Sequence, residues 1–328
     1  MDLGIDLGTA STVVSDVRRG IVFDEPSVLL LRDGGGRRPR LLAVGREAAD
    51  LLGRSPARYT AARPVHDGVV TDLETARLYL RAVLARAGRH VWSPTRAVLG
   101  VPADATALET RALVEAAEEA NIRPVTALDD AVAGAVGCGL DPLDRRVHMV
   151  VDVGGGKSDA VAFCYGGVLT QRTSKLGGDE MTVAVARYLR EEHSLLVGEL
   201  EAERVKTCPT PDESEPLVVH GRDGASGRPR LVTLQATEVA TAVRPVVTEI
   251  VRALSGTLDD LPPQALADVL AEGVLLFGGG SLVHGLPGLL ERELGLPVKL
   301  AEEPLTCVAE GAARALRNRP LLSAYRRN

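Results

Sequence analysis

The sequence predicts an α/β fold made of two related halves, with mixed sheets on either side of a cleft. Two observations lead to this prediction. Segments with strand character alternate with helical segments along the whole 328-residue chain, and this order is typical of α/β proteins. A short strand–turn–strand unit with an acid and glycines also occurs twice, about half a chain apart. Such a repeat indicates duplicated halves that face each other.

The clearer copy of this unit covers residues 148–159. An apolar run leads into Asp152, and Gly154, Gly155 and Gly156 then turn the chain into a second apolar run. This pattern predicts a β-hairpin with a glycine-rich tip. The backbone N–H groups of such a tip can surround phosphate oxygens, and the neighbouring acid can hold a divalent cation through water.

The second copy lies at the N-terminus, where Asp6 and Gly8 precede Asp152 and Gly154 by 146 residues. Apolar residues flank the acid in both copies. With the halves facing each other, we expect the two tips to hold one phosphate chain and its metal ion from both sides. The alternative is a pair of unrelated edge hairpins, because glycine turns are common. The matched acid and glycine favour the duplicated site.

Composition limits the class of protein. Hydrophobic residues make up 45% and charged residues 25% of the chain, as in a globular protein. The net charge of −6 and the aromatic content of 3% argue against nucleic acid as a partner. The four cysteines show no metal-ligand spacing and fit a reducing, cytoplasmic compartment. The chain enters a strand at once, so we expect no signal peptide, and no apolar run approaches the roughly 20 residues of a membrane span.

The expected elements alternate along the chain. Strands are predicted within 1–32 and at 41–44, 94–101, 148–163, 217–220, 274–277 and 298–300, and helices at 72–86, 105–120, 131–136, 177–192, 199–206, 236–254, 265–271, 286–294 and 306–317. We assign 1–146 to the first half, with a small insertion at about 30–65, and 147–317 to the second, with an insertion at about 195–240. The basic composition of 318–328 predicts a mobile tail.

A third glycine turn, at 278–280, follows a predicted buried strand, where the backbone can approach a flat ligand. With this turn and the two hairpins, the chain resembles the actin-like ATPase superfamily and, within it, the bacterial MreB family. The motifs that carry the resemblance are IDLGTA at 5–10, VDVGGG at 151–156, GGDEM at 177–181, GGG at 278–280 and AEEPLTCV at 301–308, with weaker support from 24–28 and 63–69. The similarity extends to about residue 317.

The resemblance implies an actin-like ATPase fold, duplicated around a nucleotide cleft, and a role for each motif. Asp6 and Asp152 would hold a water-shelled Mg²⁺ ion. The phosphates of ATP would be surrounded by Gly8, Thr9, Ala10, Gly154, Gly155 and Gly156. The nucleoside would contact Gly177, Gly178, Asp179, Glu203, Lys206, Gly278, Gly279 and Gly280. From spacing alone, Glu203 and Lys206 are instead interpreted as a solvated i,i+3 ion pair.

Two residues depart from the family pattern and bear on catalysis. Asp130, followed by Ala131, occupies the place of a Glu-Pro pair whose Glu positions the attacking water. Lys157 replaces a threonine after the triple glycine, where its charge can pair with the γ-phosphate. A water misplaced by about 1 Å can slow a reaction roughly a hundredfold, so we expect ATP binding to be retained better than turnover, in a weak or impaired ATPase. The alternative is that Lys157 points to solvent and that Asp130 reaches the water after a small backbone shift.

The resemblance also implies partners and a location. Proteins of the MreB family form filaments at the inner face of the plasma membrane and organise cell-wall synthesis and cell shape. We therefore expect self-association, a cytoplasmic protein peripheral to that membrane, and wall-synthesis proteins as partners. The sequence shows no N-terminal amphipathic helix, so Val91 and Trp92 are the candidate membrane contact. Trp92 in a local core is an equal alternative, and a contact this small would need many subunits in a filament.

Two other functions occur within the same superfamily. A small-molecule kinase, such as a sugar kinase, would need an aspartate base in a polar cluster between the halves, which the sequence does not show. A chaperone-like ATPase of the DnaK type would need a peptide-binding domain after the nucleotide domain. Neither alternative explains the MreB-specific motifs at 177–181 and 301–308, and only the filament hypothesis predicts polymers in ATP and Mg²⁺.

Overall fold

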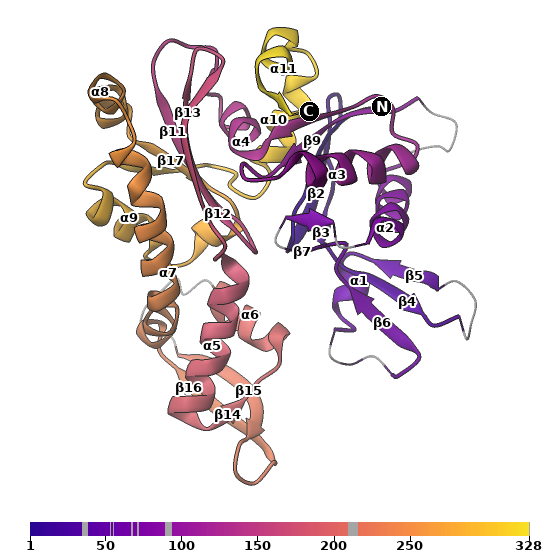
Figure 1. The fold of residues 1–328 in the computed structure, drawn as a ribbon. Coiled ribbons are helices and arrows are strands. Elements are labelled where there is room, and N and C mark those ends of the chain that lie inside the picture. The colour runs from indigo at the N-terminus through magenta and orange to yellow at the C-terminus, as the bar shows by residue number, and fades with distance from the viewer. Residues whose placement is uncertain are drawn as a thin grey trace.

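The computed structural model describes residues 1–34, 39–52, 54, 56–66, 68–70, 72–88, 94–208 and 216–327 (Figure 1). The large sheet of the N-terminal part, called sheet I here, is a mixed sheet. Its strands are β1 (Asp2–Leu7), β2 (Ser11–Asp16), β3 (Gly20–Pro26), β9 (Arg96–Val101), β10 (Val125–Asp129) and β19 (Arg326–Arg327), in the order β19-β10-β9-β1-β2-β3. Strands β1, β2 and β3 form an antiparallel meander, and β9 and β10 run parallel to β1.

Sheet II, the large sheet of the C-terminal part, repeats this arrangement. Its strands are β11 (His148–Val153), β12 (Ser158–Cys164), β13 (Gly167–Ser174), β17 (Val274–Phe277) and β18 (Val298–Leu300), in the order β13-β12-β11-β17-β18. An antiparallel meander of β11, β12 and β13 is again extended by parallel strands on the side of its first member. The predicted α/β fold with duplicated, mixed sheets is confirmed.

Smaller sheets project from each part of the molecule (Figure 1). Sheet III contains β4 (Leu29–Arg32), β5 (Arg40–Val44) and β6 (Tyr59–Ala62), and sheet IV contains β14 (Leu195–Leu196), β15 (Leu217–Asp223) and β16 (Pro229–Leu234). The short strands β7 (Val65–His66) and β8 (Val69–Val70) pair with each other. Sheet III therefore lies between residues 29 and 62, and sheet IV between 195 and 234.

Helices surround these sheets, and local sequence explains several of their boundaries. Their bounds are α1 (Arg46–Ala49), α2 (Leu73–Arg86), α3 (Ala107–Glu119), α4 (Asp130–Gly137), α5 (Gly178–His193), α6 (Glu199–Thr207), α7 (Ala236–Asp259), α8 (Pro263–Glu272), the 3₁₀ helix η1 (Gly279–Leu282), α9 (Leu286–Leu294), α10 (Cys307–Ala315) and α11 (Arg319–Tyr325). Helix α3 starts at a capping box of Thr106 and Glu109. Helix α7 buries Val243, Val247 and Ile250 at helical spacing, against the core of sheet II.

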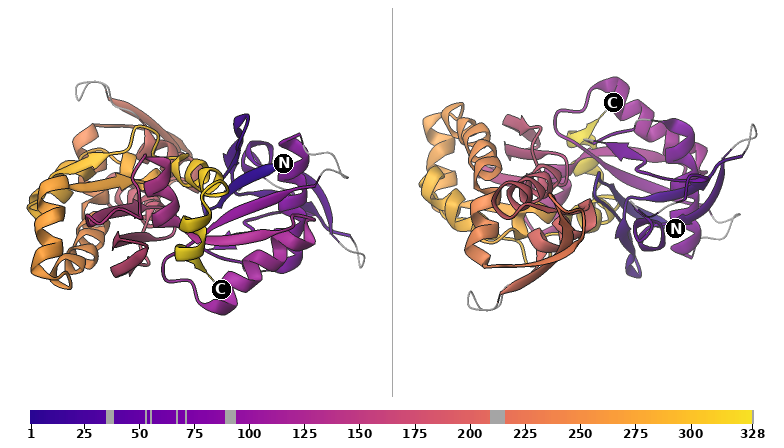
Figure 2. Two further views of the ribbon diagram at one scale, coloured as in Figure 1. Left: turned by 90° about the horizontal axis from the view of Figure 1, so that it is seen from above. Right: turned by 90° about the horizontal axis from the view of Figure 1, so that it is seen from below.

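Each large sheet has its own hydrophobic core, and a further core contains residues of both sheets. One cluster packs under sheet I and another under sheet II. The shared cluster joins Leu128 of sheet I and Phe163 of sheet II with residues of α4 and α10. Both large sheets therefore pack against one shared apolar cluster. In Figure 2, the yellow helix α10 lies between the two sheets.

Helices α4 and α10 meet at backbone contact distance. A Cβ atom placed on Gly311 of α10 would lie 1.7 Å from the carbonyl oxygen of Ala133 in α4, and one on Gly137 would lie 1.9 Å from the carbonyl oxygen of Cys307. Helix α10 approaches β1 equally closely, because a Cβ on Gly4 would lie 2.1 Å from the carbonyl oxygen of Ala309. Glycine at these positions allows the helices to come together where any side chain would clash.

The predicted mobile tail is wrong. Residues 319–325 form α11, and Arg326–Arg327 form β19, which pairs antiparallel with β10 at the edge of sheet I. Tyr325 is buried, and its hydroxyl donates to the carbonyl oxygen of Pro142 at 2.9 Å. The basic composition suggested a solvated segment, but the open edge of β10 and the apolar side chains of Leu321 and Tyr325 give this segment a binding place.

Among the residues that the structure describes, no helix is long and apolar enough to cross a membrane. Of the four cysteines, Cys307 is buried and the others are partly exposed. The structure contains no disulfide among the residues that it describes.

We predict that Gly311→Ala destabilises the protein. The added methyl group must displace α4, and overpacking of this kind costs about 1–3 kcal/mol, more than the gain of about 1 kcal/mol from helix propensity. Gly288→Ala is the matched control, because Gly288 also lies in a helix but a Cβ there meets nothing within 4 Å. Chemical denaturation should show a lower free energy of unfolding than wild type for Gly311→Ala and a higher one for Gly288→Ala. Equal stabilisation of both would contradict the proposed close contact.

Candidate functional site

The two hairpins have the same turn geometry. In the β1–β2 hairpin the N–H of Gly8 donates to the carbonyl oxygen of Ser11 at 3.0 Å, and in the β11–β12 hairpin the N–H of Gly154 donates to that of Lys157 at 2.8 Å. The acids occupy equivalent places, two residues before the glycine that opens each tip. The repeat that the sequence predicts is therefore also a repeat of hydrogen bonding.

The tips of the two hairpins touch. A Cβ atom on Gly155 would lie 2.8 Å from Cβ of Ala10 and 3.2 Å from its backbone nitrogen. Further contacts fix the first tip, since Ser27 Oγ donates to the carbonyl oxygen of Gly8 at 2.6 Å, and the N–H of Gly68 donates to Thr9 Oγ1 at 3.1 Å. The two hairpin tips thus face each other at the junction of sheets I and II.

Asp6 and Asp152, at the ends of β1 and β11, retain partial access to solvent although they lie deep in the molecule. Burial, together with the Asp24 carboxylate, raises the pKa of Asp6 to about 7. Burial also raises the pKa of Asp152 well above its ordinary range, with further contributions from Asp159 and Asp6. The junction therefore concentrates carboxyl groups that resist ionisation unless a cation joins them.

Asp130 adds a third acid to this group. It is the first residue of α4, and burial followed by the Asp6 and Asp152 carboxylates raises its pKa well above the ordinary value. Its Oδ1 is buried and has no hydrogen-bond partner among the described residues. The atom lies over Gly100, where a Cβ would come within 2.0 Å of it. A buried acceptor without a partner is costly in a folded protein, and such an atom is typical of a functional site.

The third glycine turn is part of the same site. Gly278 has a φ of 85°, and a Cβ on it would lie 2.2 Å from Oδ1 of Asp152 and 2.5 Å from the carbonyl oxygen of Val153. A Cβ on Gly280 would lie 2.5 Å from Cγ1 of Val153. Glycine is required at Gly278 both by its left-handed φ and by the Asp152 carboxylate. Gly279, between them, is exposed.

Helix α5 begins against the second hairpin. The N–H groups of Gly178 and Asp179 donate to the carbonyl oxygens of Gly154 and Gly155 at 3.0 and 2.8 Å. Glu180 caps the helix by accepting from the N–H of Gly177 at 2.7 Å. The first N–H groups of α5 are thus used to hold the glycine tip in place.

Glu203 and Lys206, on one face of α6, lie beside this helix start. Their side chains form an ion pair of 2.7 Å, as the i,i+3 spacing predicts. The pair is not simply solvated, because the Lys206 side chain is 6% exposed and its Nζ donates to the carbonyl oxygen of Gly178 at 2.9 Å. Thr182 in α5 donates from its hydroxyl to Glu203. Both residues are therefore tied to the start of α5.

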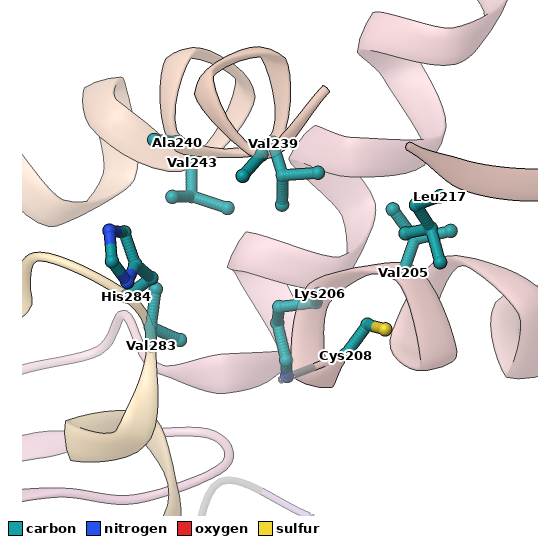
Figure 3. A pocket seen from close by; sticks show the side chains of 10 residues that line it. Val205, Lys206, Cys208, Leu217, Val239, Ala240, Val243, Val283 and His284 are labelled. Carbon is teal, nitrogen blue, oxygen red and sulfur yellow. The ribbon is translucent and has the colours of Figure 1, made fainter. Parts of the chain in front are cut away.

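A small cavity of about 20 Å³, partly open to solvent, adjoins Lys206 (Figure 3). Its walls are largely apolar and come from α6, β15, α7 and the segment after η1. They are formed by Val205, Lys206, Cys208, Leu217, Ala236, Val239, Ala240, Val243, Val283 and His284. A flat apolar group with a few polar atoms matches such a lining.

Lys157 extends from sheet II to sheet I. Its Nζ donates to Oδ1 of Asp104, in the loop after β9, at 2.7 Å, and the Lys157 side chain is only 11% exposed. It passes next to Gly68, where a Cβ would lie 3.6 Å from Nζ. The alternative in which Lys157 points to solvent is therefore wrong. Its contact with a phosphate stays a prediction.

A family assignment follows from comparison with known proteins. The family model for MreB/Mbl protein matches residues 1–323.

The chain belongs to the MreB/Mbl family.

Curated relatives agree with this assignment over nearly their full length. The chain is 37% identical over 322 residues to the cell shape-determining protein Mbl of Bacillus subtilis, covering 97% of this chain and 96% of the relative. It is 38% identical over 323 residues to the cell shape-determining protein MreB of Escherichia coli K12, covering 96% and 93%. A crystal structure of MreB5 of Spiroplasma citri bound to AMPPNP matches with a TM-score of 0.89 at 26% identity, covering 96% and 95%. The protein is thus an actin-like, MreB-type cytoskeletal protein, and the kinase and chaperone alternatives are not favoured.

Within this MreB/Mbl chain, the structure gathers the predicted site residues around the touching tips. Asp6, Asp152 and Asp130 form the acidic group, and the glycines of both tips, the α5 start and the third turn surround it. Glu203 and Lys206 reach the group through the α5 start. The role of each of these residues in binding stays a prediction.

Several polar residues near the tips were not predicted from the sequence. Asp159 lies opposite Asp152 in the β11–β12 hairpin, and burial raises its pKa to about 7. Arg63 donates from Nη1 to the carbonyl oxygen of Thr9 at 3.0 Å and from Nη2 to Glu199 of α6 at 2.7 Å. Asp104 holds Lys157. The hairpin repeat gave no signal for Asp159, because the equivalent position in the first copy is Val13.

The acids fit a magnesium ion that keeps much of its water. Within the described ranges, no group of three or more His, Cys, Asp or Glu side chains could hold a metal ion by itself. Mg²⁺ in nucleotide sites is bound through one or two carboxylates, phosphates and several waters. Asp6 and Asp152, from facing hairpins, supply the carboxylates, and the unpaired Oδ1 of Asp130 can accept from a water. The donor set therefore suits Mg²⁺ together with a phosphate ligand.

The raised pKa of Asp6 predicts how pH affects the ligand-free protein. Between its ordinary 3.8 and about 7, the folded protein holds a proton that the unfolded chain has released. This contribution to the free energy of unfolding therefore falls as pH rises through that window. Asn cannot ionise, so Asp6→Asn removes the free-energy cost of a charged side chain at this position. The variant should be more stable than wild type at pH 8 and nearly equal to it at pH 4.

Urea unfolding in EDTA, without nucleotide, measures this difference. Asp2→Asn on the same strand is the control, because the hydrogen bond and charge of Arg96 lower the pKa of Asp2. That variant should lose stability at pH 8, the opposite sign. An Asp6→Asn variant that is less stable than wild type at pH 8 would show that Asp6 is not an unfavourable charge in the folded protein.

Proposed function

We propose that this protein binds ATP with Mg²⁺ at the junction of sheets I and II and assembles into filaments. The contact between Ala10 and Gly155 carries the proposal, because it places two glycine tips and their acids on one small volume. N–H groups from both tips can surround a phosphate chain. MreB5 of Spiroplasma citri, a structural neighbour at 26% identity, was solved bound to AMPPNP and to ADP, which supports a nucleotide ligand.

Each part of the nucleotide has a proposed place. Gly8, Thr9, Ala10, Gly154, Gly155 and Gly156 surround the phosphates, and Asp6 and Asp152 hold Mg²⁺ through water. The bound ion supplies positive charge that compensates the phosphates. The base lies beside Glu203 and Lys206, at the mouth of the apolar cavity, with Gly177, Gly178 and Asp179 near the ribose and Gly278, Gly279 and Gly280 behind the nucleoside. The apolar walls of Figure 3 and the buried ammonium of Lys206 support this orientation.

Hydrolysis is proposed to be slow. The Oδ1 atom of Asp130, buried and unpaired within the described chain, is placed to accept a hydrogen bond from an attacking water. Lys157 is held near the tip of its hairpin by Asp104 and can pair with the γ-phosphate in the ground state. Contacts already made in the ground state strengthen binding without raising the rate.

The family supports a cytoskeletal role. Curated relatives from Bacillus subtilis and Escherichia coli are named cell shape-determining proteins. We propose that filaments of this protein lie at the inner, cytoplasmic face of the plasma membrane and organise cell-wall synthesis proteins. The proposed membrane contact, Val91 and Trp92, lies outside the described residues, as do Arg89 and His90 beside it.

Loss of either metal-site acid is predicted to abolish nucleotide binding and assembly. Asp6→Ala and Asp152→Ala should each remove Mg²⁺-dependent ATP affinity, because both acids share one cation and the phosphate charge is then poorly compensated. Calorimetry with Mg²⁺, followed by sedimentation and electron microscopy with ATP, measures binding and polymers. Asp2→Ala, at the far end of the same strand, is the control and should bind ATP and assemble as wild type does. Unchanged affinity in both site variants would refute the shared site.

The double change Asp130→Glu with Lys157→Thr is predicted to speed hydrolysis and to loosen ATP. The longer acid reaches further toward the γ-phosphate, and removal of the ammonium withdraws a ground-state contact. Single-turnover phosphate release provides the measurement, with each single variant beside it. A wild type that releases phosphate rapidly, or a double variant no faster than wild type, rules out this account of slow turnover.

A further inference from the structure

The guanidinium of Arg327 holds the backbone on both sides of Asp104. Its Nη1 donates to the carbonyl oxygen of Ala103 at 3.0 Å, and its Nη2 donates to that of Ala105 at 2.6 Å. A guanidinium presents its donors in a rigid planar fork, so contacts to two acceptors fix their separation as well as their position. The loop between β9 and α3 is thereby fixed at the residue whose carboxylate faces sheet II.

Arg327 itself is fixed by independent contacts. Its strand pairs with β10 through Ala127↔Arg327 and Leu128↔Arg326, and the preceding Tyr325 is buried and bonded to Pro142. Its Nη1 also lies 3.5 Å from Oδ2 of Asp129, the buried acid that caps α4. The backbone of β19 thus stays in place when only the side chain of Arg327 is changed.

The loop held by Arg327 reaches across to the second hairpin. Asp104 Oδ1 accepts from Lys157 Nζ at 2.7 Å, and the Lys157 side chain is almost covered. Gln171 of β13 donates from Nε2 to the carbonyl oxygen of Ala103 at 3.2 Å, so sheet II contacts the same loop twice. A continuous set of contacts therefore runs from β19 through this loop to the residue that follows the triple glycine.

We propose that Arg327 is a positioning residue for Lys157: by holding the carbonyl groups on both sides of Asp104, it keeps the Asp104 carboxylate on the Lys157 ammonium. The Lys157 side chain is then restrained beside the glycine tip before any ligand arrives. Where Lys157 meets the γ-phosphate, a step that rests on the proposed function, the restraint reduces the side-chain entropy lost on binding a triphosphate.

Chemical labelling of lysines tests the restraint without nucleotide. The chain has four lysines, Lys157, Lys175, Lys206 and Lys299, and Lys175 and Lys299 are exposed internal standards. An acylating reagent, quantified by mass spectrometry of the peptides, should label Lys157 slowly in wild type. In Arg327→Gln the rate at Lys157 should rise about fivefold, as for the loss of a hydrogen bond, while Lys175 and Lys299 keep their rates.

Matched variants separate positioning from general loosening. Arg326→Gln changes the neighbouring residue of β19, whose exposed side chain lies on the opposite face of the strand, and should leave Lys157 at the wild-type rate. Asp104→Asn should release Lys157 directly, and Arg327→Gln should add nothing to it. Arg327→Lys, which donates from a single point, should lie between wild type and Arg327→Gln. Thermal unfolding of each variant defines a temperature at which all are folded.

Nucleotide affinity provides the second arm of the test. With Mg²⁺, Arg327→Gln should weaken a non-hydrolysable ATP analogue about threefold, as partial release of one side chain implies, and leave ADP unchanged. Lys157 labelling at the wild-type rate in Arg327→Gln, equal acceleration by Arg326→Gln, or additive effects with Asp104→Asn would overturn the proposal. A protein that binds neither nucleotide would refute the proposed function alone, because the labelling arm still judges Arg327.

Discussion

The backbone contact between α4 and α10 is the constraint on which the rest of this structure depends. Helix α4 continues from β10 of sheet I, and α10 follows β18 of sheet II, so their contact sets the distance between the sheets. Glycines at Gly137 and Gly311 let the two backbones meet where any Cβ would clash. The position of this contact brings the carboxyl ends of β1 and β11 together, and the hairpin tips touch as a result.

This geometry places like charges close together. Asp6, Asp130 and Asp152 lie near one another deep in the molecule. Asp6 and Asp152 both raise the pKa of Asp130, and Asp6 also raises that of Asp152. A fold selected for stability alone would not keep unpaired carboxylates in its interior. The arrangement is intelligible when a cation and its ligand complete it, and unfavourable burial of this kind is typical of functional sites. The ligand-free protein accordingly contains electrostatic strain in the place where its chemistry is proposed to occur.

Local pattern predicted much of this fold, because each hairpin is encoded in a dozen consecutive residues. The spacing of Asp6 and Gly8, repeated at Asp152 and Gly154, predicted both the duplication and the meeting of the tips. The tail was mispredicted because composition reports solvation and not the presence of an open sheet edge, to which β19 binds.

Asp104, Arg63 and Arg327 could not be found from sequence in the same way. The partner of Asp104 lies 53 residues away in the sequence. The partners of Arg63 lie 54 and 136 residues away, and those of Arg327 lie 222 and 224 residues away. Such distances carry no periodic signal. The motif resemblance identified residues close to the phosphate position. Arg63 lies in the weaker segment 63–69, but the resemblance gave no information on its contacts, and Asp104 and Arg327 lie outside the motifs. The Lys157–Asp104 pair combines both cases, since only its lysine belongs to a recognisable motif.

The apolar centre shared by the sheets has a consequence for how the molecule loses its structure. Leu128 of sheet I and Phe163 of sheet II are fully buried in one cluster with residues of α4 and α10. Neither large sheet can melt without exposing part of the other's packing surface, so the two duplicated parts are expected to denature in a single cooperative transition. Sheets III and IV take no part in that cluster, but each is packed into a neighbouring core. Leu29 and Val44 of sheet III belong to the core of sheet I, and Leu195 and Val219 of sheet IV belong to the core of sheet II. The outer sheets are therefore expected to lose their structure together with the large sheet whose core they share, and the cooperative unit extends beyond the centre of the molecule.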